Sequence, residues 1–340
     1  MSKNNNKGVS MIHLNILMII LSFVSATTFA QNHPPMETEE DFHRAMEELS
    51  NWGRWGAEDE LGAANLITPE KRLEAVALVT EGITVSMAHD IVTEDAVDTS
   101  AVLNRRVLRV SPTGASDMYQ YSGSYHGTIH SHLDSLDCHI MYEGSGYNGV
   151  TYQEVEAAAG CPRGSIHAHR EGIVTRGILF DATLLPVNTN EEGWLEPGTP
   201  ITYEDLLALE EIQDIKVQPG DIIFLHTGRW KRREALGAWP TSEGVAGYHA
   251  NVAYFLKDRD VAMIGHDMWN DVGPSGIDGV RLPMHSLALV SLGVSIFDNL
   301  DFTRLAEVAK ELNRYEFLFV ASPLRIEKGM GSPLNPIAMF

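Results

Sequence analysis

Hydrophobic residues recur along the chain in two patterns that predict two kinds of element. Apolar residues three or four apart between polar ones are typical of amphipathic helices, and short apolar runs bounded by turn residues are typical of strands. Helices are predicted over residues 38–49, 68–80, 202–212, 249–257, 285–292 and 303–312. Strands are predicted over residues 82–91, 107–110, 172–180, 222–226, 261–265, 295–297 and 317–321.

The predicted strands and helices mix without strict alternation. This order favours a single α/β domain with a mixed or partly antiparallel sheet over a doubly wound parallel sheet. No glycine-rich phosphate loop occurs in the sequence, so a nucleotide cofactor is not expected. Arg176 interrupts the apolar strand and needs a partner: a substrate carboxylate or, as is favoured, a buried ion pair with Asp181 or another acid.

The first 30 residues are set apart from the predicted fold. Lys3 and Lys7 precede a mostly apolar run over residues 11–26, and Thr28-Phe29-Ala30 offers small residues at the −3 and −1 positions of a cleavage site. We expect a signal peptide over residues 1–30 and one domain over residues 31–340 in the periplasm or outside the cell. An uncleaved anchor is disfavoured, because polar and proline-containing sequence follows at once.

Composition and charge narrow the classes of partner. Apolar residues make up 44% of the chain and charged residues 21%, which is ordinary for a globular protein. The formal charge of −21 argues against nucleic acid and against an anionic membrane after signal cleavage. A small-molecule substrate and a homo-oligomer are expected instead. Cys138 and Cys161 could pair in an oxidising compartment, but two free thiols are favoured because their spacing does not resemble a disulfide scaffold.

One histidine-rich stretch carries the candidate chemistry. Residues 126–139 read HGTIHSHLDSLDCH and hold four of the 14 histidines. If the stretch is extended, its face presents four metal-ligating side chains, because side chains alternate along a strand: His126, His130, His132 and Asp134. Imidazoles and a carboxylate suit a divalent metal. The alternative is a solvated polar strand with adventitious metal affinity.

This stretch resembles the motif of the cyclase-like metal-dependent hydrolases, which include bacterial kynurenine formamidases and isatin hydrolases. A larger-chain branch of that family carries His-Gly-x-x-His-Ser-His-x-Asp-x-Leu-x-His followed by Tyr-Asn-Gly, and here Tyr147-Asn148-Gly149 follows the stretch. Further similar segments cover residues 55–65, 172–177, 227–230, 285–299 and 331–336. The resemblance implies a swivelling β/β/α fold and one or two ions of Zn²⁺ or Mn²⁺. It also implies hydrolysis of an amide or lactam C–N bond, as by an arylformamidase or an isatin hydrolase.

Two departures from the family motif leave the ligand set open. The family places a histidine four residues before the second ligand, but Thr128 lies four before His132, so either His126 or His130 must supply that ligand. A second register would place His132 where the family has its aspartate. The register with His132 and Asp134 as the His-x-Asp pair is preferred, because it keeps a bridging carboxylate.

The second departure concerns the last histidine of the motif. His139 lies five residues after Asp134 where the family has four, and an added residue flips strand parity unless a bulge absorbs it. His139 is nevertheless the preferred acid/base residue. By resemblance, His285 and Asp298 are the distal ligands of a second ion, although by themselves they read as a helix-terminal and a turn residue.

A binding or metal-buffering periplasmic protein without turnover is the alternative function.

Overall fold

The protein is described by a computed structural model that covers Met1 and residues 33–186 and 190–340. The predicted signal peptide lies, apart from Met1, outside the described residues and stays a prediction. Among the described residues, no helix combines the length and the apolar character needed to cross a membrane.

A nine-stranded mixed sheet organises the fold, in the order β1-β13-β11-β5-β7-β9-β10-β4-β12. The four strands β5, β7, β9 and β10 run parallel, and the strands outside them pair antiparallel. The sheet strands are β1 (Thr84–Ser86), β4 (His132–Asp134), β5 (Ile173–Asp181), β7 (Ile222–His226), β9 (Met263–His266), β10 (Ser295–Asp298), β11 (Glu316–Ala321), β12 (Gly331–Pro333) and β13 (Ile337–Met339). The predicted mixed sheet is confirmed.

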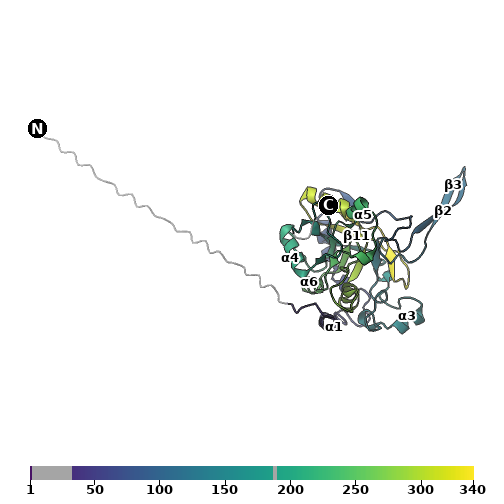
Figure 1. Ribbon diagram of the computed structural model, residues 1–340, viewed down its shortest axis with the longest axis horizontal. Coiled ribbons are helices and arrows are strands. Elements are labelled where there is room, and N and C mark those ends of the chain that lie inside the picture. Colours follow the sequence, from purple (N-terminus) through teal and green to yellow (C-terminus); the bar gives the residue numbers. More distant parts are fainter. Residues whose placement is uncertain (2–32, 187–189) are drawn as a thin grey trace. The chain divides into compact units, whose positions relative to one another are not determined.

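Helices cover both faces of this sheet (Figure 1). They are α1 (Glu39–Glu48), α2 (Pro69–Val76), α3 (Tyr152–Ala158), α4 (Tyr203–Ile212), α5 (Arg229–Leu236), α6 (Val252–Arg259), α7 (Pro283–His285) and α8 (Thr303–Leu312). A π-helix (Ser286–Leu292) continues α7 directly. Side chains of α4, α6 and the π-helix form the core on one face, and side chains of α8 form the core on the other.

The central strand β7 shows why the apolar runs become buried strands. Ile223 and Leu225 join the core on one face, while Ile222 and Phe224 join the core on the other. A parallel strand covered on both faces reads as a continuous apolar run, as residues 222–225 do, and all five residues of β7 are buried, including His226 at its carboxyl end. Arg176 on β5 has the predicted acidic partners, but they are Asp221 and Glu316 rather than Asp181.

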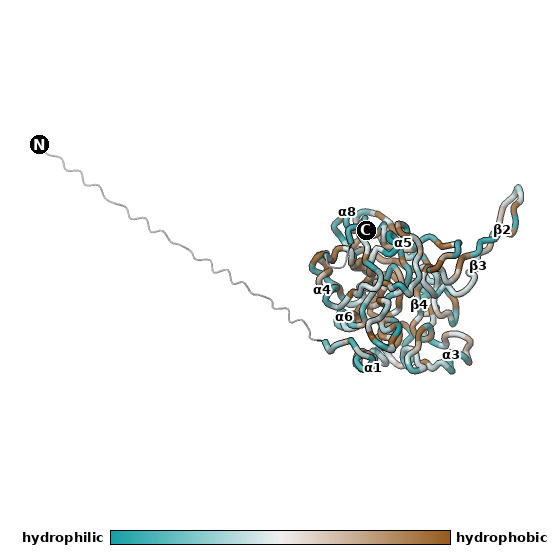
Figure 2. The backbone as a smooth tube through the Cα atoms, viewed as in Figure 1, coloured by the Kyte–Doolittle hydropathy of each residue, from teal (hydrophilic) through white to brown (hydrophobic). Residues whose placement is uncertain are grey.

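Two small sheets complete the structure. Strands β6 (Pro200–Ile201) and β8 (Gly247–Tyr248) pair in parallel. Strands β2 (Leu103–Ser111) and β3 (Gly114–Tyr121) form an antiparallel hairpin that projects from the body (Figure 1) and carries both hydrophobic and hydrophilic residues (Figure 2). The sequence pattern predicted only four residues of this hairpin.

Several predicted elements differ from the structure at their ends. The strand expected over residues 82–91 is only β1, because the chain after Ser86 is irregular apart from an isolated bridge at Ala88. The helix begins at Pro69 with Thr68 as its N-cap, as predicted, but ends at Val76. Helices α3 and α5 were not predicted. In the histidine-rich stretch, only β4 is a strand.

The expectation of two free thiols is wrong. Cys138 and Cys161 form a disulfide, with a Cα–Cα distance of 5.6 Å. The sequence separation of 23 residues gave no sign of this pairing, because it arises from a turn after β4 that meets the chain beyond α3. The bond joins the residue next to His139 to a distant part of the chain.

Candidate metal centre

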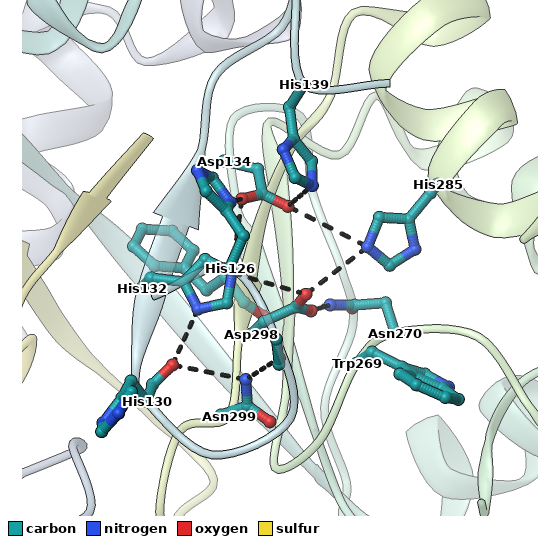
Figure 3. Close-up of polar contacts among 12 residues, drawn as sticks. His126, His130, His132, Asp134, His139, Trp269, Asn270, His285, Asp298 and Asn299 are labelled. Carbon is teal, nitrogen blue, oxygen red and sulfur yellow. Dashed lines mark hydrogen bonds and ion pairs between the residues drawn. The ribbon is translucent and has the colours of Figure 1, made fainter. Parts of the chain in front are cut away.

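The candidate centre forms where β4 pairs antiparallel with β10. This register places His132 opposite Asp298, and Asp134 opposite Ile296. Three further imidazoles arrive from segments outside these strands, namely those of His126, His139 and His285. All four histidines converge on the carboxylates of Asp134 and Asp298 (Figure 3).

Asp134 stands at the middle of this cluster. Its Oδ1 lies 2.8 Å from His126 Nδ1 and 3.4 Å from His132 Nε2. Its Oδ2 lies 3.4 Å from His139 Nε2 and 4.0 Å from His285 Nε2. The carboxylate is fully buried, so four imidazoles take the place that water would have around it.

Asp298 closes the cluster on the side of β10. Its Oδ2 lies 3.4 Å from His285 Nε2 and 3.8 Å from His132 Nε2. Its other oxygen accepts a hydrogen bond of 2.7 Å from the Asn270 side-chain amide. One oxygen of Asp298 is therefore fixed by the protein, and the other faces the two histidines.

The residues present fit a divalent cation. Neither oxygen of Asp134 has a hydrogen-bond partner, nor does Nδ1 of His126, although all three atoms are buried. Buried polar atoms without partners are rare in proteins and costly, which indicates that something else satisfies them. Imidazole nitrogens and carboxylate oxygens are the donors that Zn²⁺ and Mn²⁺ accept.

The ligand atoms fall into two groups, each with its atoms within 4.8 Å of one another. One group contains His126, Asp134 and His139, and the other contains His132, Asp134 and Asp298. Asp134 belongs to both groups. Its carboxylate would therefore be available as a ligand to an ion held by either group.

Hydrogen bonds behind the cluster hold its rings in place. His132 Nδ1 bonds the backbone oxygen of His130 at 2.7 Å, and His285 Nδ1 bonds Asp271 Oδ2 at 2.5 Å. Each contact turns Nε2 of the ring toward the carboxylates, as is usual for metal-ligating histidines. Asp271 and Asn270 were not predicted. Their position just beyond the carboxyl end of the parallel strand β9, where such sheets place functional residues, was the available signal.

Burial and charge shift the pKa values of these groups in opposite directions. Burial alone would raise the pKa of Asp134, but His139 and His132 hold it well below its usual range. Burial opposes a charge on His132, yet Asp134 raises its pKa to about 9. Burial likewise opposes a charge on His285, and Asp271 and Asp298 hold its pKa well above the usual value.

His139 differs from these two histidines. Burial lowers the pKa of His139 to about 4, although Asp134 acts in the opposite direction and the charges of His126 and His285 reinforce the shift. Its side chain is 22% exposed, whereas that of His132 is 1% exposed. His139 is therefore a neutral imidazole at the accessible side of the cluster.

The structure brings His126 to the cluster and leaves His130 outside it. The ring of His130 points away, with Nε2 2.6 Å from the Ala101 backbone oxygen and its edge against Tyr121 (Figure 3). Strand alternation would have put both histidines on one face, but the strand begins only at His132. Loop residues before it follow no such rule.

The extra residue before His139 is absorbed by a turn and not by a bulge. The chain leaves the sheet after Asp134 and turns over residues 136–138. This turn delivers Nε2 of His139 to the free oxygen of Asp134. The alternation of side chains along a strand, which the extra residue would have disturbed, ends with β4 and does not govern His139.

The chain is similar to known proteins both in its sequence and in its fold. The family described as "Putative cyclase" matches residues 83–271, more than half of the chain. A crystal structure of a novel cyclase is 28% identical with a TM-score of 0.74, and the match covers 87% of this chain and 99% of that one. No curated protein matches the chain.

Two isatin hydrolase structures share the fold at lower identity. Isatin hydrolase A from Ralstonia solanacearum is 18% identical with a TM-score of 0.54, covering 80% of this chain and 97% of that one. An isatin hydrolase bound to the product analogue thioisatinate is 16% identical with a TM-score of 0.51, covering 80% and 98%. The expected cyclase-like fold is confirmed.

The first prediction concerns the ligands. Asp134→Asn and His132→Ala should each remove most bound metal, because the remaining donors no longer enclose an ion. Asp271→Asn, which changes the side chain that bonds the ring of His285 and the backbone N–H groups of Met284 and His285, should weaken metal binding by roughly 10–100-fold. His130→Gln is the matched control, since it changes a buried histidine of the same stretch, and should keep its metal. Metal analysis of the purified variants measures this, and full occupancy in Asp134→Asn would contradict the assignment.

The second prediction concerns pH. With a pKa of about 9, His132 is protonated at neutral pH in the metal-free protein, whereas a ligand must be neutral. The apparent affinity for Zn²⁺ should therefore rise between about pH 6 and 8, by up to about tenfold per pH unit for each proton displaced. Titrations against a zinc-buffering chelator at several pH values measure this. An affinity that is constant over the range would rule out a protonated His132.

Proposed function

The chain belongs to this cyclase family, and from that premise we propose that it is a metal-dependent hydrolase of an amide or lactam C–N bond. Its substrate would be of the arylformamidase or isatin hydrolase kind. The observation that carries the proposal is the buried carboxylate of Asp134, which lacks hydrogen-bond donors and is shared by two groups of ligand atoms, one of which includes the neutral His139.

One or two ions of Zn²⁺ or Mn²⁺ would be held by five of the residues described above: His126, His132, Asp134, His285 and Asp298. When bound, such an ion polarises a carbonyl group and acidifies water. The buried hydrogen bonds that His285 makes to Asp271 and that Asp298 accepts from Asn270 keep these ligands in position, so little reorganisation is needed when an ion enters.

His139 is suited to move the proton that hydrolysis requires. Addition of water to the carbonyl releases a proton, and cleavage of the C–N bond needs one on the leaving nitrogen. Because its pKa is lowered to about 4, the imidazole of His139 is free to accept the first proton and deliver it to the nitrogen. Its ring stacks on His126 at 4.1 Å between centroids, which holds it beside the reacting groups.

Aromatic side chains border the centre and support an aryl substrate. The ring of Tyr125 lies 4.4 Å from that of His126 and 5.8 Å from that of His132. Trp269 lies near the cluster on the side of His285 (Figure 3). Flat apolar walls next to a few polar groups are typical of sites for aromatic small molecules.

We also infer that the protein acts in the periplasm or outside the cell. The Cys138–Cys161 disulfide supports this, because such bonds persist in oxidising compartments. The predicted signal peptide supports it independently from the sequence. Mature protein that still begins at Met1 would contradict the export part of the proposal.

A substrate panel tests the proposed reaction. Protein loaded with Zn²⁺ or Mn²⁺ and protein treated with a chelator are assayed on N-formyl arylamines, isatin, other lactams and lactones. We expect hydrolysis of at least one C–N substrate by the loaded protein and its loss on chelation. Hydrolysis of lactones alone would mean that the enzyme cleaves C–O bonds and would contradict the proposed C–N specificity. Tight binding of the panel compounds without turnover would favour the binding-protein alternative instead.

The role of His139 gives a separate prediction. His139→Ala and His139→Gln should keep their metal but lose roughly 10²–10⁴-fold in turnover, which is the usual contribution of a general acid/base group to the rate. Metal content and rate are measured on the same preparation. Loss of the metal would make His139 a ligand, and undiminished turnover would exclude it from proton transfer. His130→Gln again serves as the control, with both metal and rate retained.

A further inference from the structure

The segment just before β4, residues 126–131, carries both His126 and His130 but belongs to no helix or strand, and it is called the ligand loop. A side chain that follows the end of β10 holds its backbone. Asn299 donates hydrogen bonds to the backbone oxygen of Gly127 at 2.7 Å and to that of His130 at 3.3 Å (Figure 3). The loop therefore has a fixed path although it has no regular secondary structure.

A buried arginine holds the same loop from a second direction. Arg229 donates through Nη2 to the backbone oxygen of Thr128 and through Nη1 to the side-chain oxygen of Asn299 at 3.4 Å. The residue is only 4% exposed, and a charge buried this deeply costs several kcal/mol unless hydrogen bonds and opposite charges compensate it. Arg229 and Asn299 thus form one connected unit, which is called the brace.

The start of α5 keeps Arg229 in place. The carboxylate of Asp267 accepts hydrogen bonds from the backbone N–H groups of Thr227 and Gly228 at 2.9 and 3.0 Å, and from the Thr227 hydroxyl at 2.7 Å. The guanidinium also stacks over the ring of Trp230, with its Cζ 4.1 Å from the ring centroid. Because the acid satisfies the N–H groups at the start of the helix, Arg229 projects from a rigid base.

Asn299 connects the ligand loop to a ligand on the other side of the cluster. It directly follows Asp298 and has a φ of 55°, in the left-handed region that asparagine tolerates better than most residues. Its backbone N–H donates to the Met268 oxygen at 2.8 Å, and its backbone oxygen accepts a hydrogen bond of 2.7 Å from the Ser131 hydroxyl. One residue therefore fixes both the end of β10 and the ligand loop.

The held carbonyl groups separate the two histidines that could serve as the ligand of the loop. The ring of His126 reaches Asp134, whereas the ring of His130 points away toward the Ala101 backbone oxygen. An exchange of the two rings would require the backbone between them to turn over. The brace opposes this movement, because it bonds the carbonyl groups of residues 127, 128 and 130.

We propose that Asn299 and Arg229 are positioning residues that select His126 as the metal ligand of the loop. The planar fork of a guanidinium donates in two directions at once, to the loop and to Asn299, and lysine lacks this geometry. The inference rests on the proposed metal centre through His126 and is independent of the bond that the enzyme cleaves.

A double-mutant cycle with His126 tests the proposal. Asn299→Gly removes the amide but keeps the left-handed backbone, which glycine adopts without strain. The affinity for Zn²⁺, measured by competition with a chelator, should fall by roughly 10–100-fold, the usual effect of losing a group behind a ligand. In protein that already carries His126→Ala, the same change should weaken Zn²⁺ binding by less than about threefold, because the ligand that it positions is gone. A purely structural role would weaken binding equally in both backgrounds.

Hydrogen exchange of the metal-free protein gives a readout that does not depend on the ion. The amides of residues 126–131 should exchange faster in Asn299→Gly and in Arg229→Lys than in wild type, because the loop is released. Asn313→Gly is the matched control for the first variant, since Asn313 has a φ of 48° and is exposed at the end of α8. Arg232→Lys is the control for the second, since Arg232 lies on α5 as well and also stacks on a tryptophan. Both controls should keep the wild-type exchange rates and Zn²⁺ affinity.

The possible failures can be told apart. Equal weakening by Asn299→Gly with and without His126, or unchanged exchange of the ligand loop in both brace variants, would overturn the proposal and leave the metal centre intact. Wild-type affinity in His126→Ala alone would overturn the inference together with the ligand role of His126 in the proposed function. Circular dichroism checks that each variant folds, and Arg229→Lys enters the same cycle if Asn299→Gly does not fold.

Discussion

A single buried negative charge, that of Asp134, sets the arrangement of everything around it. A carboxylate with no exposed surface costs several kcal/mol unless charges or donors compensate it. The chain brings four imidazoles to its two oxygens, three from the histidine-rich stretch and one from α7, and none of them makes a proper hydrogen bond to it. The sheet, the turn after β4 and the end of α7 deliver these groups to one point.

Much of the fold could be predicted from the sequence, because its strongest signals are local. The apolar runs of β7 and β9 have one interpretation once their length and flanking turns are considered, and the mixed sheet follows from their order. His132 and Asp134 could be identified for the same reason, since they lie two residues apart on the strand β4 and so point to the same face.

His285 and Asp298 were expected only by resemblance to the family. The choice between His126 and His130, and the residues behind the cluster, could not be predicted because they depend on loops. Which of His126 and His130 faces Asp134 is decided by where the strand begins, and element ends are the weakest part of any sequence pattern. The position of His139 depends on the turn after β4, which no strand pattern describes. Asp271 carries no spacing motif with His285, and only the folded chain places the two side by side.

The disulfide also ties down a part of the chain that packing does not hold. It closes a loop that contains α3, a helix without a single buried residue. A cross-link of this span contributes about 3 kcal/mol through the unfolded chain, whereas elsewhere in the loop Tyr147 and Val150 are buried. The sequence of α3 can therefore change while Asp134 and its histidines stay in place. The loop begins at His139, so changes in it would alter the surroundings of the reacting groups, and new substrate preferences could arise there without loss of the metal centre.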